Sequence, residues 1–427
     1  MERSIEDIRK KINEKTAIVM TSQEVCDLIE KGEDVKAKDV DVVTTATRAV
    51  MSGTYALLSF PVNAPFSFKR ASKVFMNGVP AHVGPCPNES LGMLDLMVFG
   101  TAHSYLDHDY GGGHLFRDMV GRRTIDVSVI TDVEDTFQTT VTLDEMPHAK
   151  LYATRHTFKN YAAFVNCSGE PISTIFHATE FEPDMKTATF SGCGQINPLK
   201  NDPQFQTIGV GTRVLMNGAE GFVIGEGTRS SPERPNMTGF ADMHTMDPQL
   251  MGGFGTSAGP ECIASWAIPI PVVNDAIFDA IIKTDGQTPM PVMDVDRRVT
   301  ISSTSYADGW KDVDLSVEFK PVSCIKCDVC TAAENCPMDA IYFKNEKLVL
   351  DRHLCFNCGL CSTICPEEVF RAELGSIRFE TDGKLNEVPI VLRQSDRKRA
   401  LELEEKLKRM VLDGSFKLSW MVEKLRP

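Results

Sequence analysis

Eight cysteines lie in two short groups within residues 324–365 of the 427-residue chain. The first group reads CIKCDVCTAAENCP and contains Cys324, Cys327, Cys330 and Cys336. The second reads CFNCGLCSTICP and contains Cys355, Cys358, Cys361 and Cys365. Two residues between successive cysteines let the backbone surround three corners of an iron–sulfur cluster, so the fourth thiolate must come from elsewhere in the chain.

The fourth cysteine of each group predicts how the thiolates divide between two clusters. In ferredoxins of the bacterial two-cluster type, this cysteine precedes a proline and ligates the other cluster. One 4Fe–4S cluster then takes Cys324, Cys327, Cys330 and Cys365, and the other takes Cys355, Cys358, Cys361 and Cys336. A zinc site closes with four ligands and leaves the near-duplication and both Cys-Pro endings unexplained. We therefore expect two 4Fe–4S clusters as cofactors.

One spacing departs from this pattern. Five residues, TAAEN, separate Cys330 from Cys336, where the two-cluster pattern has three. We expect the two additional residues to bulge outward, which keeps Cys336 as a ligand. The alternative is that they loosen this cluster and make it more labile to oxygen.

The composition narrows the class of protein. The net charge of −14 argues against nucleic-acid or anionic-membrane partners, which require clustered Lys and Arg. The N-terminal MERSIEDIRKKINEK is too charged for a signal peptide, and the longest apolar run, 262–273, is too short to span a bilayer. We expect a cytoplasmic protein of an anaerobe, whose thirteen cysteines serve metal binding or catalysis rather than disulfides. Its partner is expected to be a small-molecule substrate or a redox partner protein.

Two capping patterns and two Asn-Gly pairs predict local structure. Ser4 with Asp7, and Thr21 with Glu24, mark the starts of two helices. VFMNGV at 74–79 and VLMNGA 140 residues later predict β-hairpins. The two hairpins are either copies from an internal duplication or unrelated. The β-branched stretch 40–60 predicts strands around a tight turn at Ser-Gly.

The whole sequence predicts an α+β fold with a large mixed α/β domain and a small ferredoxin domain. We assign residues 1–300 to the large domain and 321–370 to the bacterial-type two-cluster ferredoxin domain. The polar stretch 292–321 is expected to be a connection. Residues 371–427 predict a hairpin with an Asp-Gly turn and an amphipathic helix that ends at Gly414. We expect this segment to pack back on the large domain, which makes the ferredoxin an insertion; the alternative is a simple tail.

Three stretches of the large domain, NYAAFVNCSGEP, SGCGQINPLKNDPQFQTIGVGTRVLMNG and WAIPIPVVN, carry a family resemblance. They resemble the homocysteine-biosynthesis family of archaea and anaerobic bacteria, over residues 4–300 and again over 390–425. In combination with the eight ferredoxin cysteines, the chain resembles the sixteenth methanogenesis-marker metalloprotein family. The resemblance implies formation of homocysteine from aspartate semialdehyde and a sulfur source, with iron–sulfur groups supplying sulfur or electrons.

Two positions depart from the sulfur-transfer branch of that family. Where that branch has a cysteine in VTTGTFGPMCSSGA, this chain has VTTATRAVMSGTYA, with Met51 and Ser52. The nearest match to a second motif, GTDCYP, is ITDVEDTF, with Val133 at the cysteine position. The alternative function is therefore an electron-transfer module that docks to a redox partner.

Two other cysteines are candidate catalytic residues, because a thiolate is the reactive form in sulfur chemistry. Cys193 lies in SGCGQINP, where glycines allow a substrate to approach the backbone. Cys86 lies between prolines in HVGPCPNES, which predicts an exposed loop. For both, the alternative is a structural thiol. The loops YGGGHLF, TIGVGTR and MGGFGTSAG favour an enzyme over a docking platform, because a platform has no need of them.

Overall fold

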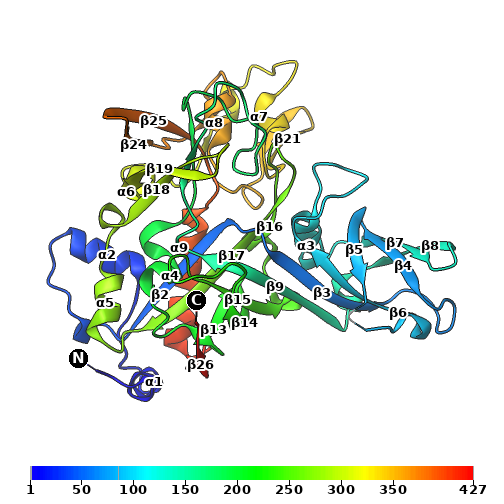
Figure 1. The fold of residues 1–427 in the computed structure, drawn as a ribbon, viewed down its shortest axis with the longest axis horizontal. Helices are drawn as coiled ribbons and strands as arrows, with labels where there is room; N and C mark the ends of the chain where they lie inside the picture. Colours follow the sequence, from blue (N-terminus) through cyan, green and yellow to red (C-terminus); the bar gives the residue numbers. More distant parts are fainter. Residues whose placement is uncertain (1, 85, 427) are drawn as a thin grey trace.

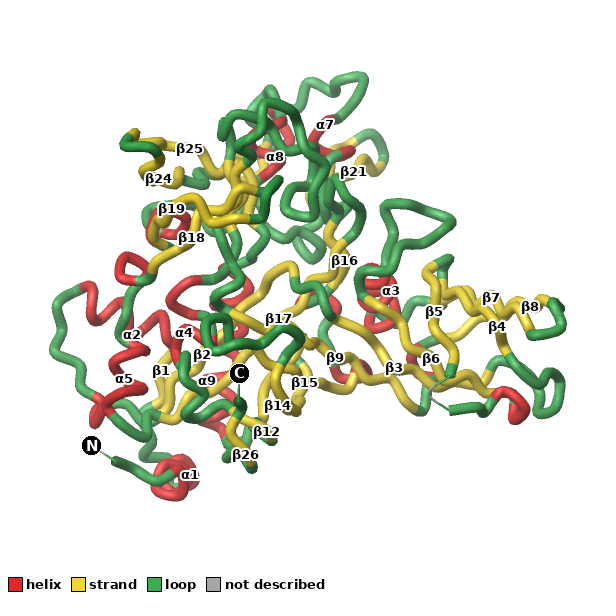
Figure 2. The backbone as a smooth tube through the Cα atoms, viewed as in Figure 1, coloured by secondary structure: helices red, strands yellow, loops and turns green. Residues whose placement is uncertain are grey.

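The computed structural model describes residues 2–84 and 86–426, and it has a mixed α/β fold built on two sheets (Figures 1 and 2). The larger sheet has 14 strands, and β16 (Gly252–Phe254) joins it by pairing with β17. The other strands, in spatial order, are β1 (Val19–Thr21), β2 (Val42–Val50), β17 (Glu261–Pro271), β13 (Arg213–Met216), β14 (Ala219–Glu226), β15 (Asn236–Asp242), β9 (His148–Thr157), β3 (Thr54–Pro61), β6 (Met93–Phe99), β5 (Val79–Val83), β4 (Ala71–Met76), β7 (Ile125–Thr131) and β8 (Thr136–Val141).

The strand order of the large sheet is symmetric about the pairing of β3 with β9. On one side the order is β3-β6-β5-β4-β7, and on the other it is β9-β15-β14-β13-β17. Both predicted Asn-Gly hairpins are present, as β4–β5 and β13–β14, and they occupy equivalent places in the two halves. The half that contains β4 to β8 forms an arm that extends away from the rest of the molecule (Figure 1).

The asparagines of the two turns make matching hydrogen bonds. Asn77 accepts the Asp126 N–H at its side-chain oxygen and donates its own N–H to the Asp126 carbonyl, both at 2.9 Å. Asn217 makes the same two bonds with Ser265, both at 2.8 Å. Both asparagines have positive φ, 47° and 49°, as the turn requires. Of the two interpretations of the repeated Asn-Gly pairs, the structure favours the internal duplication.

The smaller sheet joins segments from both sides of the cysteine-rich region. Its order is β19 (Val299–Ser305), β18 (Pro289–Asp294), β10 (Ala163–Val165), β11 (Ala188–Phe190), β25 (Lys384–Arg393) and β24 (Ser376–Thr381). The expectation of a connection over 292–321 is wrong, because β18, β19 and α6 (Ala307–Trp310) occupy much of it. The polar pattern arises because most side chains of β19 are at least partly exposed. The predicted hairpin is β24–β25.

Both N-terminal helices begin where the capping patterns predict. Ser4 caps α1 (Ile5–Asn13) and Thr21 caps α2 (Ser22–Glu30), each in a full capping box. The remaining helices of the large domain are α3 (Gly112–Val120), α4 (Pro198–Asn201) and α5 (Asp275–Ile281). The predicted turn after β2 is present, with Gly53 at φ 88°, but β2 and β3 pair with other strands and form no hairpin with each other.

The C-terminal helix α9 (Arg397–Asp413) packs on the large sheet. Leu403, Leu407 and Val411 are buried in one cluster with residues of β2 and β17, and Gly414 ends the helix in the left-handed conformation. The chain therefore returns to the large sheet after the cysteine-rich region, as an insertion requires (Figure 1). Among the described helices, none is long and apolar enough to cross a membrane.

Candidate functional site

The eight cysteines lie on a compact segment, residues 318–371, which we call the cysteine segment. It lies at the top of Figure 1 and contains β20 (Glu318–Phe319), α7 (Thr331–Glu334), β21 (Ile341–Lys344), β22 (Lys347–Leu350), α8 (Leu360–Ile364) and β23 (Phe370–Arg371). The outward bulge expected at TAAEN is absent. These residues form α7 with Ala332 buried, because a helical turn accommodates the two additional residues against α8.

The cysteines line two separate cavities. Cys324, Cys327, Cys330 and Cys365, the outer quartet, line one cavity. Cys336, Cys355, Cys358 and Cys361, the inner quartet, line the other. In each cavity three thiols come from one cysteine group, and the fourth comes from the other group. The structure thus brings together the same two sets of four that the spacing predicts.

The donor set of these cavities distinguishes a multi-iron cluster from a single metal ion. Among the described residues, no three His, Cys, Asp or Glu side chains converge closely enough to hold one metal ion. A cubane carries one thiolate on each of four irons, so its cysteines stand further apart than the ligands of a mononuclear site. Four thiols around a cavity lined otherwise mainly by apolar side chains fit a cluster, whose reduction potential depends on its exposure to solvent.

The two quartets differ in exposure. Cys355, Cys358 and Cys361 of the inner quartet are buried, whereas Cys327 of the outer quartet is exposed. Burial raises the pKa of Cys336 to about 11. Burial also raises the pKa of Cys355, and so does the nearby Asp396 carboxylate, while the Asn357 N–H and the Arg352 and Arg399 guanidiniums lower it. Burial is the largest of these effects, so the pKa of Cys355 lies above its ordinary value.

The inner quartet packs directly on the large domain. Phe356, between two of its cysteines, meets Phe254 of β16 edge-on with ring centroids 5.3 Å apart. The Pro337 carbonyl accepts the Gly255 N–H at 2.7 Å, and the Cys358 carbonyl accepts the Arg393 N–H at 2.8 Å. One hydrophobic cluster spans both parts of the protein. The cysteine segment is therefore part of the folded core and not a separately attached module.

Arg48 of β2 lies at the centre of this junction. Its guanidinium pairs with Asp396 at 2.7 Å and stacks 4.6 Å from the centre of the Phe356 ring. Asp396 accepts the Asn357 side-chain amide at 3.2 Å, and the Asn357 N–H donates to the Cys355 sulfur at 3.4 Å. Continuous contacts therefore lead from an inner cysteine to β2 of the large sheet.

Cys193 lies at the far end of these contacts. Its thiol donates to the Arg48 carbonyl at 3.7 Å and is completely buried. Burial raises the pKa of Cys193 to about 11, so the thiol is protonated at neutral pH. Next to it, Arg397 forms a buried ion pair with Asp285. A buried thiol with a raised pKa is a poor nucleophile, so this geometry favours a structural or positioning role.

The other sequence candidates lie apart from Cys193. Cys86 is exposed in the loop after β5, on the arm. Met51 is buried after β2, where its N–H donates to the Cys262 carbonyl at 2.7 Å. The adjacent Ser52 hydroxyl donates to Glu261 at 2.8 Å. Val133 is 70% exposed in the turn between β7 and β8, so the two positions without cysteine do not share one site.

The glycine-rich loops are filled by protein atoms. A Cβ added at Gly113 lies 2.6 Å from the Gly252 carbonyl oxygen, and one at Gly253 lies 2.1 Å from the His114 ring. A Cβ at Gly194 lies 2.1 Å from the Asp285 carboxylate. These glycines allow segments of this chain to approach one another. Close packing within the chain therefore explains the glycines in these loops without a bound substrate.

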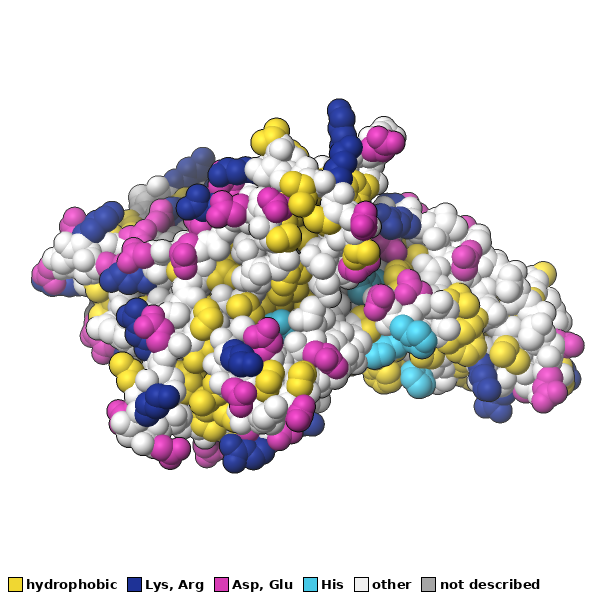
Figure 3. All heavy atoms as spheres, turned by 90° about the horizontal axis from the view of Figure 1, so that it is seen from above, with side chains coloured by type: hydrophobic (Ala, Val, Ile, Leu, Met, Phe, Trp, Pro, Cys, Tyr) yellow, Lys and Arg dark blue, Asp and Glu magenta, His cyan; other side chains and the backbone are white. Residues whose placement is uncertain are grey.

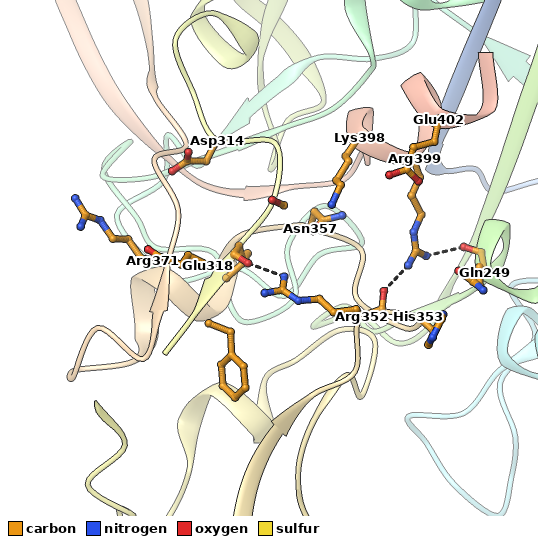
Figure 4. Close-up of a pocket in the computed structure, with 13 residues that line it drawn as sticks. Gln249, Asp314, Glu318, Arg352, His353, Asn357, Arg371, Lys398, Arg399 and Glu402 are labelled. Atoms are coloured by element: carbon orange, nitrogen blue, oxygen red, sulfur yellow. Dashed lines mark hydrogen bonds between the residues drawn. The ribbon is translucent and has the colours of Figure 1, made fainter. Parts of the chain in front are cut away.

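A large cavity opens where the cysteine segment meets α9. This junction cavity has a volume of about 970 Å³. Figure 4 shows Lys398 extending from α9 towards Asn357, with Arg352 below them and Arg399 beside them. Because Asn357 also contacts Cys355, the cavity reaches the edge of the inner quartet.

Sequence reasoning did not identify Arg48, Asp396 or the junction cavity. One signal was present in the sequence: three consecutive basic residues, Arg397, Lys398 and Arg399, begin α9. Positive charge at a helix N-terminus opposes the helix dipole, so such a run indicates another role. Acidic residues follow it closely in the sequence, which hides this signal.

Comparison with known proteins identifies the family. Residues 17–418 match the family described as "Homocysteine biosynthesis enzyme, sulfur-incorporation". The chain belongs to this family. The matched residues include the cysteine segment, so in this member of the homocysteine-biosynthesis family the eight cysteines lie inside the region that matches the family.

Individual relatives agree with this assignment. An uncharacterized protein of Methanothermobacter thermautotrophicus is 43% identical over 97% of this chain and 94% of its own length. An L-aspartate semialdehyde sulfurtransferase of Methanosarcina acetivorans is 31% identical over 65% of this chain and 55% of that protein. An uncharacterized ferredoxin of Methanocaldococcus jannaschii is 39% identical over 46 residues, 11% of this chain and 30% of its own length. No solved structure matches the chain.

Proposed function

We propose that the cysteine segment holds two 4Fe–4S clusters, one in each quartet. The observation that carries the proposal is that each cavity is lined by three cysteines of one group and the fourth cysteine of the other. That exchange of the fourth ligand is the pattern of two-cluster ferredoxins. When bound, the clusters supply electrons one at a time.

The proposed activity is a redox-assisted sulfur transfer that makes homocysteine from aspartate semialdehyde. The family membership and the related sulfurtransferase support it. The aldehyde and hydrogen sulfide give a thioaldehyde and water, and the thioaldehyde takes up two electrons and two protons to give the thiol. Because Ser52 and Val133 stand where the sulfur-transfer branch of the family has cysteines, the sulfur arrives as sulfide and not on this chain's own thiolates.

The residues at the junction support this assignment. The contacts from Cys355 through Asn357, Asp396 and Arg48 join the inner quartet directly to the large domain. All four residues are buried. Close packing of this kind favours movement of electrons from the cysteine segment into the domain that carries the family's chemistry.

A second candidate function is an electron-transfer module that docks to a redox partner protein. Three large apolar side chains beside the outer quartet are exposed: Val322 by 95%, Ile325 by 62% and Val329 by 54%. Figure 3, which views the molecule from this end, shows hydrophobic side chains on the surface. Exposed apolar groups of this kind mark interaction sites, and both functions need a partner or reductant at this end.

An anaerobic assay tests the proposed function. The reconstituted protein receives aspartate semialdehyde, sulfide and a low-potential reductant, and homocysteine is measured by mass spectrometry. The proposal predicts product that requires both protein and reductant, and that is lost in Cys361→Ala. No product from protein that retains about eight irons per chain would reject the sulfur-transfer activity and favour the electron-transfer module.

A further inference from the structure

The junction cavity is lined by more basic than acidic side chains, and its basic side chains form no salt bridge among the described residues. Four basic residues line it: Arg352, Arg371, Lys398 and Arg399. None of the four forms a salt bridge within the described ranges 2–84 and 86–426. This concentration of positive charge occurs in a chain whose net charge is −14.

Backbone carbonyl groups hold two of these cations in place. Arg352 donates to the Val317 carbonyl at 2.6 Å. Arg399 donates to the Gln249 carbonyl at 2.7 Å and also to the Arg352 carbonyl. A carbonyl oxygen fixes the direction of a guanidinium but leaves its charge uncompensated. The two guanidiniums are therefore oriented in advance and keep their charge available to an anion.

The acidic residues at the cavity are partly engaged elsewhere. Glu318 forms an ion pair at 3.1 Å with Lys320, which does not line the cavity. Asp314 accepts the Glu373 N–H at 2.8 Å. Glu402 is the third carboxylate. Four basic side chains thus face three carboxylates, one of which pairs with Lys320, so a net positive charge remains in the cavity. Lys398 and Arg371 are exposed, and no hydrogen bond joins either side chain to the described residues, so both side chains can bind a ligand.

We propose that the junction cavity binds a small-molecule polyanion that carries phosphate or carboxylate groups. Arg352 and Arg399 form its fixed wall, and Lys398 and Arg371 bind it from the open side. The volume of about 970 Å³ lies at the upper end of the range for small-molecule sites, so it accommodates a molecule with more than one anionic group. Planar guanidiniums and a flexible ammonium together suit either type of anion. This inference does not depend on the sulfur-transfer activity.

Isothermal titration calorimetry on the anaerobically reconstituted protein tests the inference. The probes are fructose 1,6-bisphosphate for phosphate groups, tricarballylate for carboxylates, and L-aspartate as a control of lower charge. We expect one saturable site per chain for at least one polyanion, and much weaker binding of L-aspartate. Tighter binding of the bisphosphate indicates a phosphate-bearing ligand, and tighter binding of tricarballylate indicates a polycarboxylate.

Matched variants locate the site. Lys398→Gln and Arg371→Gln are expected to weaken polyanion binding by about tenfold each, because each removes one charged contact. Arg409→Gln, an exposed residue on the same helix outside the cavity, is expected to change nothing. Four results would overturn the inference: no saturable binding, equal weakening in Arg409→Gln, unchanged affinity in both cavity variants, or binding of L-aspartate alone.

Discussion

Arg48 and Asp396 form an ion pair that is almost completely removed from solvent, with side chains 1% and 0% exposed. The residues are 348 positions apart in sequence, and the pair joins β2 to the start of α9. Because Arg48 also stacks on Phe356, the same pair holds the cysteine segment against the large sheet. The insertion, the sheet and the C-terminal helix therefore meet at one charged contact.

Asp396→Asn is expected to destabilise the protein by about 3–5 kcal/mol, because it leaves the buried Arg48 guanidinium without a counter-charge. Asparagine keeps the side-chain oxygen that accepts the Arg399 N–H at the helix start, so the helix cap is retained. Urea unfolding under anaerobic conditions measures the loss. The matched control is Glu387→Gln, which breaks the exposed Arg378–Glu387 pair and should leave stability unchanged. Equal stabilities of Asp396→Asn and wild type would contradict the proposed role of the pair.

The two quartets should differ in their sensitivity to substitution. Cys327→Ala removes an exposed ligand of the outer quartet, so we expect loss of about half of the iron and little loss of stability. Cys358→Ala removes a buried ligand whose backbone contacts Arg393, so we expect loss of iron together with clear destabilisation. Iron analysis and urea unfolding of both variants measure this difference. The same effect from both substitutions would show that burial does not distinguish the quartets.

Glu404 on α9 should make stability depend on pH. Burial raises the pKa of Glu404 from its ordinary value of 4.5 to about 8, although Ser22 donates a hydrogen bond to it. The folded protein thus holds a proton that the unfolded chain releases near pH 4.5, so wild-type stability falls as pH rises from about 4.5 to about 8. Glu404→Gln has no such charge to bury. We expect it to be more stable than wild type by roughly 1–3 kcal/mol at pH 9, with a smaller difference at pH 6.

Urea unfolding at pH 6, 7, 8 and 9 measures the Glu404 effect. Glu405→Gln is the control, because Glu405 is a partly exposed neighbour on the same helix. A constant difference between wild type and Glu404→Gln across this range would show that Glu404 carries no shifted proton.

Alkylation should distinguish the two candidate catalytic cysteines. Cys86 is exposed, whereas Cys193 is completely buried and burial raises its pKa to about 11. At pH 8, iodoacetamide should therefore modify Cys86 in the folded protein and reach Cys193 only after unfolding, because the thiolate reacts. Cys26 is an internal control, since it is also buried and burial raises its pKa to about 11. Peptide mapping gives the order in which the cysteines are modified. Rapid modification of Cys193 in the folded protein would contradict the prediction and indicate an accessible, reactive thiolate.

Local features of the fold could be predicted from sequence because each depends on a few neighbouring residues. Ser4 and Thr21 cap their helices, both Asn-Gly pairs form turns, and Gly414 ends α9. The grouping of the eight cysteines followed from their spacing and the two Cys-Pro endings, compared with the two-cluster ferredoxin pattern. In each case, the residues that determine the feature lie in one short segment or, for the cysteines, in the two similar groups.

Features that depend on distant segments could not be predicted in this way. The polar sequence of β19 did not indicate a strand. Pairing with β18 satisfies the hydrogen bonds of its backbone, while most of its side chains stay at least partly exposed. Arg48 lies in a run of β-branched residues, and nothing nearby indicates that its partner is Asp396. Cys193 combines a glycine-flanked position with complete burial, which its neighbours in sequence do not reveal.

A single-turnover experiment tests most directly whether the cysteine segment supplies the electrons for sulfur transfer. Protein with both clusters reduced, freed of excess reductant, receives aspartate semialdehyde and sulfide, and homocysteine is counted against protein. Two one-electron clusters hold the two electrons that one thiol needs, so the account predicts about one homocysteine per chain. Oxidised wild type and reduced Cys361→Ala should give none. Equal yields from oxidised and reduced protein, or no product from protein with both clusters reduced, would contradict the account.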